Sequence, residues 1–434
     1  MPSRSSRSPL HAIRVTLAAG EPLSSGELAR RAGVSQATAW RVLREDLRGE
    51  TLLLGKGRGA RFALVNTLGR HGHCWPVLQV RGDGSVGRFA RMTALAGDNW
   101  HIEFERDEPL YQRGLRDGFC EGWPWFLDSL RPEGHLGRTF ARRNAPAIGA
   151  NRDLDLWRPA DYLLAALLFG GDFPGNFLIG EHHTADAEAR PSEEDWPEIA
   201  RLSAEGSAAT AAGASGTAGG ERAKFVTSSE IVKFARGRSG GSGRWADLLV
   251  AEALAAETLA AFGFNAAASR IVERGGFVFH ASARFDRTGR RGRRGVHSLR
   301  AVDDGLFGTA EGSWPAVAER MRVEGLLSDP HAGEVAAVWH FGQLIGNNDM
   351  HGGNFAFHPG PEGMLVPAPV YDMLPMRYRP VGGILPDNPL PDPPPEAAAD
   401  ASAREAAADY WRRVAEDDRV SADFRAVADR NRRR

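Results

Sequence analysis

The sequence predicts a multi-domain α+β protein in which an N-terminal winged helix-turn-helix is followed by a larger two-lobed fold. Three observations support this prediction. Residues 1–65 contain 11 Lys and Arg against 5 acidic residues, a charge of +6 in a chain whose net charge is −1. Residues 203–220 consist almost wholly of Ala, Ser, Thr and Gly, which indicates a break between globular parts. Around Asp349, a polar cluster stands where a helical apolar pattern ends and a strand-like run begins.

Length and composition limit the class of protein. The 434 residues, 42% hydrophobic and 25% charged, are ordinary for a globular chain of about two to three domains. Cys74 and Cys120 are too few for a disulfide framework or a zinc site and favour a reducing compartment. No apolar run is long enough to span a bilayer, and the N-terminus lacks the apolar core of a signal peptide. We therefore expect a cytoplasmic protein without a membrane partner.

Residues 1–66 have the pattern of a winged helix-turn-helix. An amphipathic helix is expected over residues 11–18, Ser25 is expected to cap a second helix, Gly33 to make the turn, and residues 35–45 to form a third helix. The third helix and the Gly-rich hairpin after it carry the candidate DNA contacts Gln36, Thr38, Arg41, Arg44, Lys56 and Arg58. We expect DNA binding through residues 1–66. A solvated basic face or a protein-docking module remains the alternative.

The middle of the chain, residues 71–185, is expected to form a sheet with an aromatic core. Alternating apolar residues predict strands at 77–80, 88–92 and 100–104. The aromatic residues that follow are interpreted as core and not as a ligand site. The next segment is first acidic and then rich in Ala, Ser and Gly, which predicts a flexible linker over residues 186–216.

A candidate phosphotransfer site lies further along the chain. Phosphoryl transfer requires a carboxylate that orients the attacking hydroxyl and oxygen ligands that hold Mg²⁺ on the phosphates of ATP. Asp349 and Asn354 have the Asp-x-x-x-x-Asn spacing of a protein-kinase catalytic loop, and Asp372 follows 18 residues after Asn354 at an expected strand end. The same residues could form an ordinary polar turn, because Asp, Asn and Gly are common in turns.

A lysine and a glutamate upstream could complete this site. Lys233 lies in the strand-like run 231–235, and Glu252 falls on the apolar side of a helix expected over 247–262. A buried carboxylate requires a cation, and Lys233 is the expected partner of Glu252. Without this partner, a lysine at the end of a strand is more often a solvated charge on an edge strand.

The run Leu-Ile-Gly-Asn-Asn-Asp-Met-His-Gly-Gly-Asn at 344–354, followed by Ala-Pro-Val-Tyr-Asp-Met at 368–373, resembles the catalytic and metal segments of the HipA-type serine/threonine kinases. These kinases are the toxins of bacterial toxin–antitoxin pairs. The resemblance implies a HipA-like two-lobed, protein-kinase-like fold that uses ATP and Mg²⁺. It also implies Asp349 as the catalytic base, Asn354 and Asp372 as Mg²⁺ ligands, and the pair of Lys233 and Glu252 as part of the ATP site.

Two other segments resemble parts of the same family. Residues 217–225 resemble its phosphate loop, which implies autophosphorylation at Thr217 and ATP contacts at Gly219, Gly220 and Lys224. Residues 281–287 resemble its hinge, which implies adenine contacts at Arg284 and Phe285. The chain departs from the family at Thr217, where the family has the autophosphorylated Ser, at Ala223, where it has Pro, and at Ala283, where it has Glu. The implied domains are a kinase N-lobe at 217–290, a helical lobe at 291–380, and a Pro-rich segment with C-terminal helices at 381–434.

Two functions remain open at this point. The first is a serine/threonine protein kinase of the HipA toxin type that phosphorylates itself and a protein substrate of unknown identity, with an N-terminal domain that could autoregulate. The second is a DNA-binding transcriptional regulator on a degenerate kinase scaffold, which binds a nucleotide or a partner without transferring phosphate. An antitoxin partner and a homodimer are compatible with either function.

Overall fold

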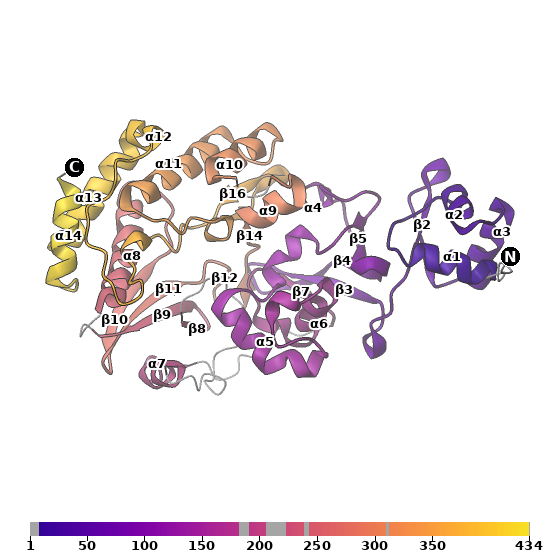
Figure 1. The fold of residues 1–434 in the computed structure, drawn as a ribbon, viewed down its shortest axis with the longest axis horizontal. Coiled ribbons are helices and arrows are strands. Elements are labelled where there is room, and N and C mark those ends of the chain that lie inside the picture. Colours follow the sequence, from indigo (N-terminus) through magenta and orange to yellow (C-terminus); the bar gives the residue numbers. More distant parts are fainter. Residues whose placement is uncertain (1–7, 182–190, 205–222, 238–242, 310–311, 434) are drawn as a thin grey trace, which may run out of the picture.

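The computed structural model describes residues 8–181, 191–204, 223–237, 243–309 and 312–433. The chain forms four parts in sequence order: an N-terminal unit, a middle unit, a sheet lobe and a helical lobe. Figure 1 shows the N-terminal helices at one end of the molecule and the last two helices, α13 and α14, at the other. No helix among the described residues is both long and apolar enough to cross a membrane.

The N-terminal unit has its elements in the predicted order, namely α1 (Pro9–Leu17), α2 (Ser25–Ala32), α3 (Gln36–Arg41) and the antiparallel hairpin of β1 (Thr51–Leu54) and β2 (Arg61–Leu64). Ser24, not Ser25, caps α2, because it forms a capping box with Glu27. Gly33 adopts the left-handed conformation (φ 69°) that ends α2. A wider π-helical turn at Val42–Asp46 continues the third helix. The assignment of this unit as a winged helix-turn-helix stays a prediction.

The middle unit is a five-stranded antiparallel sheet in the order β6-β5-β4-β3-β7, with helices packed on it (Figure 1). The three predicted strands are present and longer than predicted. The aromatic residues form a buried core, as expected, with Phe126 and Phe173 fully inaccessible. The elements are β3 (Cys74–Val80), β4 (Val86–Leu95), β5 (Asn99–Phe104), α4 (Pro109–Gln112), β6 (Phe119–Cys120), α5 (Gly134–Ile148), α6 (Pro159–Phe169) and β7 (Phe177–Ile179).

The sheet lobe is a four-stranded antiparallel sheet in the order β10-β11-β9-β8, covered by one helix on each face. Side chains alternate along each strand, so Ala235 and Val278 pack against α8, whereas Val232 and Phe279 pack against α7. The elements are α7 (Trp196–Ala204), β8 (Lys224–Val226), β9 (Glu230–Arg236), α8 (Gly243–Ala261), β10 (Ser269–Arg274) and β11 (Phe277–Ala283).

Helix α7 corrects the linker prediction. A flexible linker was expected over residues 186–216, but residues 196–204 are helical. Trp196, Ile199 and Ala200 are spaced on one side of this helix and are buried against Phe225 and neighbouring side chains of the sheet. The apolar stripe is short and lies between acidic and Ala-rich stretches, so composition alone concealed it. Residues 205–216 lie outside the described residues.

The helical lobe packs helices around a small three-stranded sheet in the order β14-β15-β16. A parallel bridge between Ala266 and Val370 joins this lobe to the sheet lobe. The elements are β12 (Arg287–Thr288), β13 (Gly292–Arg293), β14 (His297–Ser298), α9 (Leu299–Leu306), α10 (Trp314–Val323), α11 (Asp329–Ile345), β15 (Ala356–Pro359), β16 (Leu365–Pro367), α12 (Pro395–Ala399), α13 (Ala401–Glu416) and α14 (Ala422–Arg432).

Candidate functional site

A cavity with a volume of about 730 Å³ lies where the middle unit, the sheet lobe and the helical lobe meet. A space of this size is in the range of small-molecule and cofactor sites. Its lining includes seven of the residues that the sequence predicted for the site: Lys224, Lys233, Glu252, Arg284, Phe285, Asn354 and Asp372. Residues more than a hundred positions apart in the chain therefore face one space.

A lysine held between two carboxylates stands at the base of this cavity. Lys233 Nζ lies 2.6 Å from Glu252 Oε1 and 2.6 Å from Asp372 Oδ1. Burial alone would lower the pKa of Lys233, but the charges of Asp372 and Glu252 outweigh burial and raise that pKa above its usual value. The expected partnership of Lys233 and Glu252 is present, and the prediction that Lys233 is buried, not an edge charge, agrees with its 11% side-chain exposure.

Asp372 has an unusual backbone and an unusual charge environment. Its φ of 55° lies in the left-handed region, which a non-glycine residue adopts only when its surroundings compensate. The bridge between Ala266 and Val370 fixes the chain two residues before it. Burial would raise the pKa of Asp372, but the nearby Lys233 and Lys224 lower it to about 2. Asp372 is therefore a carboxylate at neutral pH.

The loop from Asp349 to Asn354 begins directly after helix α11, which ends at Gly346 in the left-handed conformation. Asn347 Oδ1 accepts a hydrogen bond from the Asp349 amide at 3.1 Å, and Asn354 Nδ2 donates to the Asp349 carbonyl at 2.8 Å. Asn354 lines the cavity, whereas Asp349 is half-buried and is not part of its lining. The structure thus places Asn354 and Asp372 in the lining of the cavity. Asp349 lies outside the lining but is hydrogen-bonded to Asn354 through its carbonyl.

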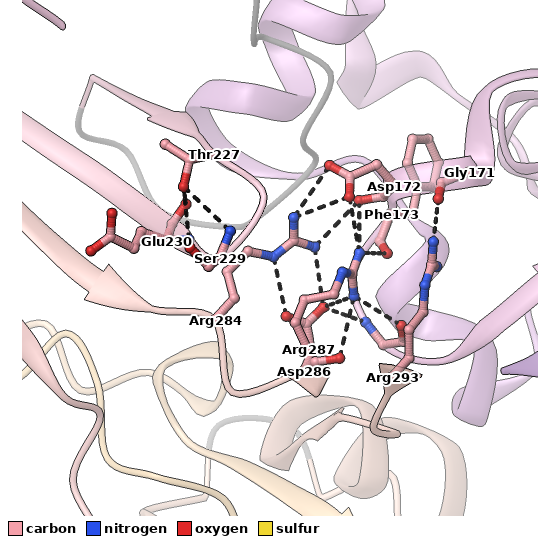
Figure 2. A network of polar contacts seen from close by, with 11 residues as sticks. Gly171, Asp172, Phe173, Thr227, Ser229, Glu230, Arg284, Asp286, Arg287 and Arg293 are labelled. Atoms are coloured by element: carbon pink, nitrogen blue, oxygen red, sulfur yellow. Dashed lines mark hydrogen bonds and ion pairs between the residues drawn. The ribbon is translucent and has the colours of Figure 1, made fainter. Parts of the chain in front are cut away.

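Arg284 is occupied by a buried network of ion pairs. Its guanidinium lies 3.1 Å from Asp172 of the middle unit and 3.2 Å from Asp286, and its side chain is 4% exposed (Figure 2). Burial alone would lower the pKa of Arg284, but Asp286 and Asp172 outweigh burial and raise it. Arg284 lines the cavity, yet its charge is directed to these carboxylates. Phe285 also lines the cavity and packs beside Tyr371 with ring centroids 5.4 Å apart.

Two further arginines extend this network (Figure 2). Arg287 pairs with Asp286 at 2.5 Å and with Asp172 at 3.1 Å, and Arg293 donates to the Gly171 carbonyl. Burial lowers the pKa of Arg293 to about 9. Arg293 is buried and the side chain of Arg287 is 12% exposed, and acceptors from the middle unit bind both. The network connects the middle unit to the segment that follows β11.

The sequence did not predict that the middle unit would contribute a wall of the cavity. Asp128, Arg131 and Glu133 line it, and Glu133 pairs with Arg300 of the helical lobe at 2.5 Å. Arg131 lies 3.0 Å from Asp128 and 4.9 Å from the ring of Tyr162. One feature of the sequence could have indicated this wall. Charged residues lie inside and directly after a run of apolar and aromatic residues, and charges in such a place need partners.

Other predicted site residues lie away from the cavity or outside the described part. Thr217, Gly219 and Gly220 lie outside the described residues. The candidate DNA contacts lie on the N-terminal unit. Thr38 is half-buried, and the other candidates are exposed, namely Gln36, Arg41, Arg44, Lys56 and Arg58. Arg41 lies 3.6 Å from Asp46, and the guanidinium of Arg44 lies 5.6 Å from the centroid of the Trp40 ring.

Comparison with known proteins defines the class to which this fold and cavity belong. Residues 216–430 match the HipA-like C-terminal domain, and residues 71–187 match the middle domain of YjjJ-like toxins. The chain belongs to the HipA family of toxins, which confirms the resemblance found in the sequence. Toxin YjjJ of Escherichia coli (strain K12) is 34% identical over 430 residues, which cover 94% of this chain and 93% of that toxin.

A solved structure shares the fold. It belongs to the complex of the Shewanella oneidensis MR-1 toxin–antitoxin system HipA, HipB and its operator DNA. The match covers 82% of this chain and 96% of that chain, with a TM-score of 0.53 and 14% sequence identity. At this identity the likeness concerns the fold alone, a mixed α/β multi-domain architecture.

Proposed function

We propose that the protein is an ATP- and Mg²⁺-dependent serine/threonine protein kinase of the HipA toxin type. The observation that carries this proposal is the placement of Lys233 between Glu252 and Asp372 in a cavity that Asn354 also lines. In phosphoryl transfer the protein mainly positions reactants and stabilises charge, and a lysine fixed by a helix glutamate next to metal-binding oxygens is suited to that task.

The buried lysines are suited to hold the phosphates of a nucleotide. Lys233 cannot turn away from the cavity, because Glu252 from α8 holds its ammonium group. Lys224 is only 6% exposed and lines the same cavity, so its cation and that of Lys233 face one ligand space. Two buried cations attract an anionic ligand more strongly than they would at the surface, because the effective dielectric constant is lower there.

The residues of the cavity fit a magnesium ion. Mg²⁺ is usually bound through one or two carboxylates or other oxygens and through the phosphates of the substrate. Asn354 uses its Nδ2 for the Asp349 carbonyl, which leaves Oδ1 as the ligand atom, and Asp372 uses one carboxylate oxygen for Lys233 and offers the other. When bound there, Mg²⁺ would neutralise phosphate charge.

Asp349 is suited to act as the base on a hydroxyl that arrives from outside the cavity. The base must reach the substrate hydroxyl, whereas the nucleotide fills the cavity, so its position next to the lining is compatible with this role. The hydrogen bond from Asn354 to its carbonyl holds Asp349 near the metal ligand. The hydroxyl would belong to a protein substrate of unknown identity or to Thr217 of the same chain.

A second function is favoured by one specific contact. Lys233 donates a hydrogen bond directly to Asp372, so both charged groups already have a partner in the absence of a nucleotide. Together with the departures from the family pattern at Ala223 and Ala283, this contact supports a DNA-binding regulator on a degenerate kinase scaffold. Such a protein would bind a nucleotide or a partner without transferring phosphate.

The deciding experiment is incubation of the purified chain with labelled ATP and Mg²⁺, followed by mapping of the phosphosite. Wild type should become labelled, and Asp349→Ala should lose the label while nucleotide binding is kept. Asp418→Ala is the control, since the side chain of Asp418 is 99% exposed and lies in the turn between α13 and α14. Absence of label on wild type that still binds nucleotide would support the regulator instead.

We propose further that residues 1–66 form a DNA-binding domain. Residues 71–185 would form a HipA N-terminal-like subdomain, 217–290 a kinase N-lobe-like part, 291–380 the helical kinase lobe, and 381–434 a Pro-rich segment with C-terminal helices. The exposed Arg41, Arg44, Lys56 and Arg58 support DNA binding. An antitoxin is a proposed partner, because the solved structure with the similar fold is a complex with HipB and operator DNA. A homodimer is also proposed, because helix-turn-helix proteins commonly bind DNA as dimers. Replacing Arg44 and Arg58 with Ala should weaken binding to any DNA and flatten its salt dependence; unchanged binding would contradict the assignment.

A further inference from the structure

A second, much smaller cavity lies behind the pair of Lys233 and Glu252. Its volume is about 10 Å³, and it is lined by residues of α8, β10 and β11 and by the segment around Asp372. Three polar residues in its wall have buried atoms with no hydrogen-bond partner among the described residues. These atoms are Glu252 Oε2, Ser269 Oγ and both ring nitrogens of His280.

Strand pairing explains why these side chains meet. His280 on β11 stands opposite Lys233 on β9, and Ser269 on β10 stands opposite Ser282 on β11. Side chains alternate between the two faces of a strand, so all four lie on the face that α8 covers. Glu252 of α8 enters the same layer and reaches Lys233. We call the space enclosed by Glu252, Ser269 and His280 the polar chamber.

The geometry excludes a direct hydrogen bond between His280 and Glu252 Oε1. His280 Nδ1 lies 3.7 Å from Glu252 Oε1, which is beyond hydrogen-bond distance. Each buried polar atom left without a partner costs about 1–3 kcal/mol, so several such atoms around one space require a shared partner. A buried water typically makes about three hydrogen bonds and needs roughly 10–15 Å³ of space.

We propose that one ordered water molecule occupies the polar chamber and bridges Glu252 Oε2, Ser269 Oγ and His280. His280 is then a positioning residue: through the water it fixes the rotamer of Glu252, and Glu252 in turn fixes Lys233. The water also supplies the partner that Ser269 lacks. Only the measurement of nucleotide affinity depends on the proposed function. The water itself can be observed in a crystal without any ligand.

The charges around His280 are consistent with a neutral ring. Glu252 faces it from α8, Lys233 faces it from β9, and Asp372 is close on the segment after β16. Burial lowers the pKa of His280. A neutral imidazole has one N–H donor and one acceptor nitrogen, and a water molecule can accept from the first and donate to Glu252.

The test compares three variants of the full chain. His280→Leu removes both ring nitrogens, His280→Gln keeps a donor and an acceptor, and Phe279→Leu is the matched control, because Phe279 is buried on the opposite face of the same strand. The measured quantities are the affinity for Mg-ATP by titration calorimetry and the water in a high-resolution crystal structure.

We expect His280→Leu to weaken Mg-ATP binding by roughly tenfold and His280→Gln to restore most of it. Phe279→Leu should bind as wild type does even where it is less stable. A water peak should lie within hydrogen-bond distance of Glu252 and Ser269. The same Mg-ATP affinity for His280→Leu as for wild type, or a polar chamber without a water peak, would overturn the inference. If wild type binds no nucleotide, the proposed function fails, and the crystallographic water alone decides the inference.

Discussion

Replacing Lys233 with methionine should destabilise the sheet lobe strongly. The substitution keeps an unbranched apolar side chain, one atom shorter, and removes the cation that two carboxylates share. Glu252 Oε1 and Asp372 Oδ1 each lie 2.6 Å from Lys233 Nζ, so without the ammonium the two anionic oxygens face each other at most about 5 Å apart. Both side chains are largely buried, at 6% and 22% exposure.

The magnitude follows from this distance. At an effective dielectric constant of about 20, two like charges about 5 Å apart repel by about 3 kcal/mol. Removing one partner of a buried ion pair costs about 3–5 kcal/mol in general, so we expect a loss of this size. The repulsion raises the pKa of one of the two carboxyl groups in the folded variant. A group whose pKa is raised on folding stabilises the folded state as the pH falls, so acidification should recover part of the loss.

Native-state hydrogen exchange of α8 and β9 measures the loss as a free energy of local opening. Arg270→Met is the matched control, because Arg270 also stands between two carboxylates, Glu193 and Glu230, but is 46% exposed. An exposed ion pair contributes about 0–1 kcal/mol, so the control should change little. The reasoning is refuted if Lys233→Met loses no more stability than Arg270→Met, or if lowering the pH does not narrow the difference.

Three further predictions concern other parts of the structure. Asp172→Asn should weaken the contact between the middle unit and the hinge segment by about 3–5 kcal/mol, because Arg284 then keeps a single carboxylate partner. Amide hydrogen exchange at β7 and β12 should become faster. Unchanged exchange there would contradict the prediction. Trp196→Ala should cost about 3–5 kcal/mol and release α7, with faster proteolysis near residue 196 as the measurement and an unchanged cleavage pattern as the contrary result. In wild type, the pKa of Asp372 is lowered from 3.8 to about 2, so the stability that its charge contributes is complete above about pH 4 and should disappear as the pH falls toward 2. Acid titration of Asp372→Asn should lack this loss of stability between about pH 4 and pH 2.

The sequence predicted the fold most reliably where local signals agree. Gly33 and Gly346 end helices in the left-handed conformation, and apolar periodicity located α8 and α11. It was least reliable where a short element depends on distant partners. Helix α7 is an example, since Trp196 is buried only because the sheet of the sheet lobe provides a surface for it.

The candidate site shows the same division. Residue spacing together with the family resemblance selected Asp349, Asn354 and Asp372, whose roles stay proposals. The requirement that a buried carboxylate has a cation predicted the pair of Glu252 and Lys233, which the structure contains. Spacing could not show that Asp372 also bonds to Lys233, because the two residues are 139 positions apart. Nor could it show that the charge of Arg284 would be directed to Asp172.

By itself, the sequence determined the family, the order of the elements and the residue types that carry the proposed chemistry, since these depend on neighbours within a few turns or on short motifs. Only the tertiary structure decided which charges meet: the contact of Lys233 with Asp372, the buried arginine network and the polar chamber around His280. The physical reason is that the energy of a buried charge or polar group depends on the partners that packing brings to it, and those partners come from other parts of the chain.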